Sequence, residues 1–194
     1  MHPDARRQQL LDAATWVFAR MIAKQQGWDA DKDVKIVGLG GLDAQLAALS
    51  RKEIHAFVWG DGGAVTQLAG KSKVLMRLDK VTARWISQIQ YVSEDGIRKQ
   101  GDDIRKVMKG LFSAIRFMND QTNDAAEIVA KKIGWSPEAV LAAHKISGPL
   151  FSLNGQVSLE ALSSMQEVLL EHGVIKKKLP VEEHVAREFF PVRL

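Results

Sequence analysis

Two glycine-rich turns carry the residue types in this chain that could bind a small ligand. They are residues 38–41, GLGG, and residues 59–63, WGDGG, and each follows a short apolar stretch. Unpaired N–H groups at the start of a helix carry partial positive charge and attract anions or carboxylates. We therefore expect ligand contacts at Gly40, Gly41, Trp59 and Asp61. A structural interpretation is equally compatible with the pattern, with Trp59 in the core and Asp61 as a helix N-cap.

The sequence offers no pattern for catalysis or for a cofactor. A dinucleotide fingerprint needs glycine at the sixth position of its turn, where this chain has Asp43. There is no cysteine, no GxSxG elbow and no Walker loop. No two histidines have the i, i+4 spacing of a zinc-binding helix, and His172 is placed to act as a cation at a helix C-terminus. We therefore expect a binding module rather than an enzyme, with no metal and no NAD or ATP bound below about 100 µM.

Composition and charge exclude further classes of protein. The chain has 194 residues, a formal charge of +4 and a hydrophobic share of 46%. The positive charge is spread out, apart from the run 176–178, and a nucleic-acid binder would show a basic stripe. We therefore expect no nucleic-acid partner. No segment approaches about 18 uninterrupted apolar residues, the length needed to span a membrane, and residues 1–21 lack the apolar core of a signal peptide. If Met1 is the natural start, this predicts a cytoplasmic protein.

The elements that must position these turns alternate in the first half of the chain. Apolar spacing predicts a helix over residues 4–26 that stops at Gly27. The strands expected after it are residues 34–37, 54–59, 74–78 and 86–92. Helices are expected at 42–52 and 64–68. The fold class is therefore α/β.

The second half of the chain reads as helical. The first helix carries an amphipathic stripe, made of Ile104, Val107, Met108, Leu111, Phe112, Ile115 and Met118. Further helices are expected from Asn123 to Gly134, from Ser136-Pro137 to about His144, and from Ser158 to Gly173. The predicted division is residues 1–85 and 86–194. Trp85 and Tyr91 flank the strand at 86–92, where each could lie in the core or face a cleft.

Residues 14–63 and the helical half together resemble one family. The N-terminal stretch reads ATWVFARMIAKQQGWDADKDVKIVGLGGLDAQLAALSRKEIHAFVWGDGG, and the helical part contains SEDGIRKQGDDIRKVMKGLFSAIRFMNDQTNDAAEIVAKKIGWSPEAV. In their order these residues are similar to the second lobe of periplasmic substrate-binding proteins of ABC importers. The closest group is the nitrate, sulfonate, taurine and thiamine-pyrimidine-precursor type. The resemblance covers about residues 14–194.

This resemblance implies a fold and a function. It implies a type II periplasmic-binding-protein fold, with residues 1–85 as the second lobe and 86–194 as a crossover strand and helical return into the first lobe. The chain would hold a small organic or anionic solute (a sulfonate, nitrate or a pyrimidine) between two lobes and deliver it to an ABC permease. The implied location is the periplasm. Thr15, at the end of the family's Ser/Thr-rich loop, becomes a ligand contact, with Trp85 and Tyr91 as weaker ones.

Three departures from the family matter. His55 stands where the family usually has aspartate, residues 1–13 do not match, and the family's first hundred or so residues are missing. The alternative is therefore a truncated remnant that does not transport, or a stand-alone ligand-sensing domain. In either case we expect a homodimer, because the apolar stripe in 104–118 needs a surface to cover it.

Overall fold

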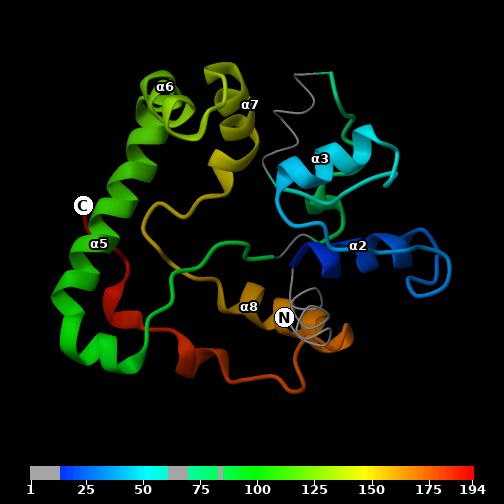
Figure 1. The fold of residues 1–194 in the computed structure, drawn as a ribbon. Coiled ribbons are helices and arrows are strands. Elements are labelled where there is room, and N and C mark those ends of the chain that lie inside the picture. Colours follow the sequence, from blue (N-terminus) through cyan, green and yellow to red (C-terminus); the bar gives the residue numbers. More distant parts are fainter. Residues whose placement is uncertain (1–13, 61–69, 83–84) are drawn as a thin grey trace. The chain divides into compact units, whose positions relative to one another are not determined.

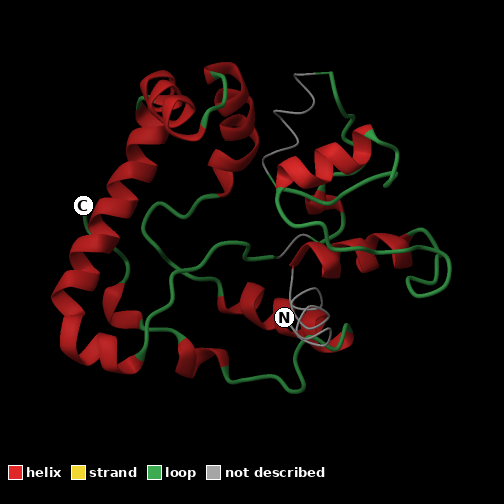
Figure 2. Cartoon of the chain, in the orientation of Figure 1, coloured by secondary structure: helices red, strands yellow, loops and turns green. Residues whose placement is uncertain are grey.

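Every regular element of the described chain is helical. The computed structural model describes residues 14–60, 70–82 and 85–194, and across these ranges it contains helices and turns but no strand. Figure 2 shows the same result as helices joined by loops. The predicted α/β, periplasmic-binding-protein-like fold is therefore wrong. The helix expected at 64–68 and the first part of the one at 4–26 lie outside the described residues.

The four segments predicted as strands fail to build a sheet. Residues 34–37, 54–59, 74–77 and 86–92 lie outside any helix, and Leu78 begins the 3-10 turn η1 (Leu78–Lys80). No backbone hydrogen bond between described residues joins one of these segments to another, and the bond from the Lys80 N–H to the Arg77 carbonyl is local to that turn. A strand is stabilised by its ladder with a neighbouring strand, whereas apolar spacing describes one segment at a time. The sequence pattern therefore indicated where the helices are interrupted, but it wrongly predicted that these segments pair as strands of a sheet.

Contacts along the chain divide it into two units. The first comprises Met1–Ser87 with Ala161–Leu179, and the second comprises Gln88–Glu160 with Pro180–Leu194. The predicted division lay between residues 85 and 86 and placed all of 161–179 in the second part. None of the described helices is both long enough and apolar enough to cross a membrane.

The first unit contains α2 (Ala14–Gln25), α3 (Leu42–Ser50), the 3-10 turn η1 (Leu78–Lys80) and most of α8 (Leu159–Glu171). These are coloured blue, cyan, green and orange in Figure 1. Glycines end α2 and α8 as predicted, because Gly27 and Gly173 have φ values of 75° and 71°, where a side chain would be strained. The buried apolar side chains of this unit are Val17, Phe18, Ala23, Ala48, Val81 and Ala161.

The second unit is built on α5 (Glu94–Asp120), α6 (Thr122–Ile133) and α7 (Pro137–Ser147). In Figure 1, α6 and α7 lie side by side at the C-terminal end of α5. The N-cap of α7 is Ser136, whose Oγ accepts a hydrogen bond from the Ala139 N–H at 3.2 Å. Asn123 was expected to cap α6, but the helix begins at Thr122 and Asn123 lies in its first turn. Ala126, Ala130 and Val140 form the buried centre of the α6–α7 pair.

Short 3-10 turns complete the second unit, and the last of them packs on α5. They are η2 (Gly148–Leu150), η3 (Val181–His184) and η4 (Arg187–Phe189). The Arg105 guanidinium lies 4.8 Å from the ring centroid of Phe189, and it donates a hydrogen bond to the Glu188 carbonyl. The C-terminal segment is thereby fixed to the middle of α5.

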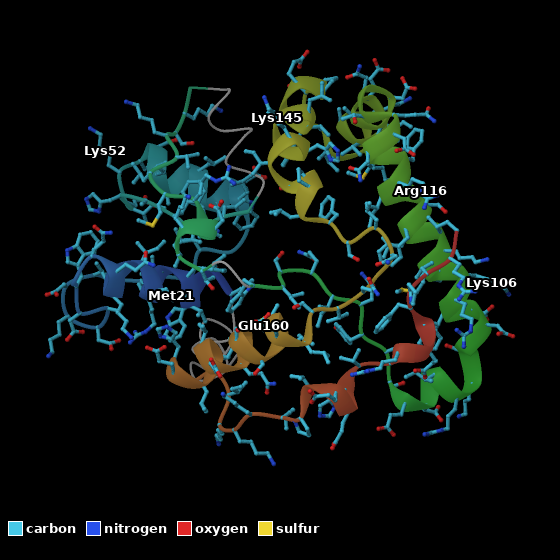
Figure 3. All side chains as sticks on the ribbon, turned by 180° about the vertical axis from the view of Figure 1, so that it is seen from behind. Met21, Lys52, Lys106, Arg116, Lys145 and Glu160 are labelled. Atoms are coloured by element: carbon cyan, nitrogen blue, oxygen red, sulfur yellow. The ribbon has the colours of Figure 1, made fainter. Side chains whose placement is uncertain are left out.

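The apolar stripe of α5 is largely covered by the chain itself. Phe112 is buried, Val107 is exposed, and the other members of the stripe are half-buried. Lys106 and Arg116, labelled in Figure 3, are exposed on the same helix. A dimer therefore does not need this stripe as its contact surface, and the homodimer itself stays a prediction.

Candidate functional site

One face of α2 is covered by the segment that follows η1. The Gln25 side-chain amide donates to the Val81 carbonyl at 3.2 Å, and the Trp85 ring packs on Phe18 with centroids 4.9 Å apart and planes tilted by 59°. Val81 therefore contacts the C-terminal end of α2 and Trp85 contacts a position nearer its N-terminal end. The chain from Val81 to Trp85 therefore passes α2 in the antiparallel direction. In this way Trp85 contacts a helix that is distant from it in the sequence.

Thr15 lies on this same face. It precedes Phe18 by three residues, the spacing that places two side chains on one side of a helix, and it is exposed. Trp85 is half-buried. Phe18 thus links two of the predicted ligand contacts, an exposed hydroxyl and an indole held in place by a ring contact. A hydroxyl can donate or accept a hydrogen bond, and an aromatic face provides the apolar contact common in small-molecule sites.

The opposite face of α2 is charged, but its charges are paired. Arg20 donates two hydrogen bonds to the Asp31 carboxylate, at 2.6 and 2.8 Å. Its guanidinium also lies 4.9 Å from the ring centroid of Trp16. The hydrogen bond to Asp31 raises the pKa of Arg20, and the same bond lowers the pKa of Asp31. Two of its five N–H donors are bound to Asp31, and the carboxylate offsets the guanidinium charge.

His172 borders this charged face and does not behave as a helix-terminal cation. Burial lowers its pKa below the ordinary value of 6.5, and the positive charges of Arg20 and Lys24 lower it further. Glu171 acts in the opposite direction, but its carboxylate is already paired with the Lys24 ammonium. The lowered pKa disfavours the charged form that the sequence led us to expect at this helix end.

The turn at Gly40 and Gly41 is open to solvent. Gly40 has a φ of 83°, and its carbonyl accepts a hydrogen bond from the Gln45 side-chain amide at 2.8 Å. Gly41 is the N-cap of α3, and no side chain caps the helix there. The first N–H groups of α3 are therefore available to a ligand. Asp43 in the first turn opposes an anion at this position, so the turn favours a neutral hydrogen-bonding group.

The remaining predicted contacts are not brought to the Thr15–Trp85 face. Trp59 is half-buried at the end of its extended segment, and Asp61 lies outside the described residues. Tyr91 is 91% exposed and belongs to the second unit. No ring contact or hydrogen bond between described residues joins Trp59 or Gly41 to Trp85. Among the described residues, the ring contact of Trp85 with Phe18 of α2 relates Trp85 to the helix that carries Thr15, and the other predicted contacts lie elsewhere.

Two residues of this face were missed by sequence reasoning. Phe18 was predicted only as part of an apolar stripe, and Gln25 was not singled out. Gln25 is a polar residue at the end of the apolar stripe of α2, on the same side as Phe18. Such a residue indicates that a backbone group packs against the helix there, but the sequence does not show which segment supplies that group.

The second unit contains a small cavity among the residues that line α5, α6 and α7. This cavity of about 10 Å³ lies between α5, α6 and α7, lined by Met118, Thr122, Ala125, Ala126, Val129, Val140 and His144. This is space for about one water molecule. The Nδ1 atom of His144 is buried there without a hydrogen-bond partner. Among the described residues, no group of three or more acidic, histidine or cysteine side chains could hold a metal ion.

Comparison of the chain with models of known families, with curated proteins and with solved structures finds no match.

Proposed function

We propose that this chain binds a small organic or anionic solute and serves as the solute-binding component of an ABC uptake system. The observation that carries the proposal is the packing of the Trp85 ring on Phe18 of α2, one helical turn from the exposed Thr15. The sequence resemblance implied a ligand contact at both Thr15 and Trp85. The proposal retains the function that the sequence pattern suggests and does not include the two-lobed α/β architecture.

The chemistry of this face favours a small molecule with one polar group. The Trp85 ring gives an apolar surface, Thr15 gives one hydrogen-bonding hydroxyl, and the paired Arg20 supplies no free positive charge. Sulfonate, nitrate and pyrimidine-like solutes remain the candidate classes, and a permease is the partner that the resemblance implies.

The test is a binding titration followed by tryptophan fluorescence and calorimetry. The probes are sodium nitrate, taurine and an aminopyrimidine, each raised to about 1 mM, a weak-affinity limit. We expect one of them to quench or shift the fluorescence. Thr15→Ala and Trp85→Ala should each weaken that binding by more than about tenfold, or about 1.4 kcal/mol, with unchanged circular dichroism.

Matched controls come from exposed residues of the same types. Ser113→Ala removes an exposed hydroxyl from α5, and Trp28→Ala removes an indole that is 51% exposed. Both should leave the affinity unchanged. The absence of binding by all three probes, or equal affinity in Thr15→Ala and the native chain, would contradict the proposal.

An alternative function is a stand-alone ligand-sensing domain that dimerises. The observation that favours it is the exposure of apolar side chains in the extended segments, Leu75 at 81% and Ile89 at 52%. Such residues are more often covered in a monomer, and a run of them marks an interaction surface. A solute that changes the association state would favour the sensor, whereas binding to permease-containing membranes would favour transport.

A further inference from the structure

Segment 86–92 lies outside any helix and is an uncharged stretch in which apolar or aromatic residues are mixed with Ser87, Gln88 and Gln90. Its sequence is ISQIQYV, and it runs directly into Ser93, the N-cap of α5. Ile89 is 52% exposed, Tyr91 is 91% exposed and Val92 is 43% exposed. Large apolar residues at adjacent positions of an extended chain resemble a strand that lacks its neighbour.

The backbone of this segment is also unpaired. None of residues 86–92 makes a backbone-to-backbone hydrogen bond with another described residue. An extended segment with free N–H and C=O groups is a template for pairing with another strand. Among the described residues, this segment therefore has no neighbouring strand to pair with its backbone and no apolar surface packed on its exposed side chains.

The order of residues in this segment is self-complementary. In an antiparallel pair of two identical segments centred on Ile89, each Ile89 faces its own symmetry mate. The other facing pairs are Ile86 with Val92, Ser87 with Tyr91, and Gln88 with Gln90. β-branched side chains face each other, amides face amides, and no charge faces a like charge, which is what stabilises cross-strand pairs.

A second exposed segment provides the contrast. Leu75 is 81% exposed in the extended segment 73–77, but a pair centred on Leu75 would place Lys73 opposite Arg77. Like charges directly opposite each other destabilise such a pair. Exposure alone would favour Leu75 as the contact, whereas residue order favours Ile89.

We propose that residues 86–92 pair with the same residues of a second copy as a two-stranded antiparallel ribbon, giving a symmetric dimer. The two-fold axis passes between the two Ile89 residues, so the same patch is used on both chains. On one face of the ribbon, Ile89 and Tyr91 of both copies lie together, because alternate residues of a strand share a face. The inference does not depend on solute binding.

Cysteine cross-linking tests the pairing and its register, because the native chain has no cysteine. Directly facing residues of an antiparallel pair have Cα atoms about 4.5–5.5 Å apart, within reach of a disulfide. Under mild oxidation Ile89→Cys should therefore form a disulfide dimer. Gln88→Cys alone should form little, whereas a mixture of Gln88→Cys and Gln90→Cys should cross-link at least about tenfold faster than either alone. Leu75→Cys is the control for exposure without complementarity.

Association in solution gives the second measurement. The native chain at tens of micromolar should sediment as a dimer, and Ile89→Lys should sediment as a monomer because it places two ammonium groups at the two-fold axis. Ile128→Lys, on a residue of α6 that is 61% exposed, should leave the dimer intact. Helical content by circular dichroism should be the same in all three proteins.

Three results would overturn the proposal. One is a native chain that is monomeric at this concentration. Another is Leu75→Cys cross-linking as readily as Ile89→Cys. The third is Gln88→Cys cross-linking alone as fast as in the mixture, which indicates parallel in-register stacking. If Ile89→Lys fails to fold, the cross-linking pattern decides by itself.

Discussion

Gly155 and Gly134 form a matched pair for testing how the helical unit is packed. Their φ values are 78° and 77°, so an alanine at either position meets nearly the same backbone strain. Their surroundings differ. A Cβ on Gly155 would lie 3.0 Å from two ring carbons of the buried Phe112 and 3.7 Å from the Met108 methyl group, whereas a Cβ on Gly134 would meet nothing within 4 Å.

The magnitudes follow from these contacts. Left-handed backbone costs a residue with a Cβ roughly 1–2 kcal/mol, and this is the whole loss expected for Gly134→Ala. Gly155→Ala should lose the same amount plus about 1–3 kcal/mol for overpacking against a ring that is already buried. We expect the free energy of unfolding to differ between the two variants by about 1–3 kcal/mol.

Urea denaturation followed by circular dichroism measures this difference. At an m-value of about 2 kcal/mol per molar, the Gly155→Ala midpoint should lie roughly 0.5–1.5 M below that of Gly134→Ala. Adding Phe112→Leu should narrow the gap, because the shorter side chain leaves room for the new methyl group. Equal midpoints for the two alanine variants, or a gap that Phe112→Leu does not change, would refute this account of the packing.

Three further predictions concern caps, protonation and the α2 face. Ser136→Ala and Ser93→Ala should each lower the free energy of unfolding by about 1 kcal/mol, because each hydroxyl caps a helix. Thermal melts measure this loss. An unchanged melting temperature would show that the serine does not stabilise its helix as an N-cap. The pKa of His172 is lower in the folded chain than its ordinary 6.5, so the unfolded chain binds the proton more readily. Stability should be highest above about pH 6.5 and should fall as the pH drops below it, and His172→Gln should flatten this dependence in urea titrations between pH 5 and pH 8. A double-mutant cycle of Phe18→Leu and Trp85→Leu should give a coupling of about 0.5–1.5 kcal/mol, and additive losses would show that the ring contact contributes nothing.

The helix ends were predictable because their signals are local. Ser136 followed by Pro137 marked the start of α7, and Gly27, Gly134 and Gly173 marked helix ends that the structure has at or next to these positions. In each case the deciding interaction involves residues within one turn of each other. Asn123 was wrongly predicted as the N-cap of α6. No side chain caps that helix, so the sequence around its start carries little local signal.

The candidate site was only partly predictable. Thr15 and Trp85 were both selected from the sequence, but the contact of Trp85 with Phe18 depends on the segment after η1 packing on α2. Arg20 shows the opposite case, because its charge could be read from the sequence but its pairing with Asp31 could not. The choice between an anion site and an aromatic site therefore required the folded chain.

By itself, the sequence determined most of the described helices, the serine caps of α5 and α7 and the glycines at which helices end. These features depend on side-chain periodicity and on glycine, serine and proline acting over a few residues. Tertiary structure alone decided that the predicted strands do not pair with one another and that Arg20 and Lys24 of α2 pair with carboxylates from outside the helix, Asp31 and Glu171. Both outcomes depend on which distant segments meet. That choice is fixed by long-range contacts whose free energy appears only when the whole chain has folded.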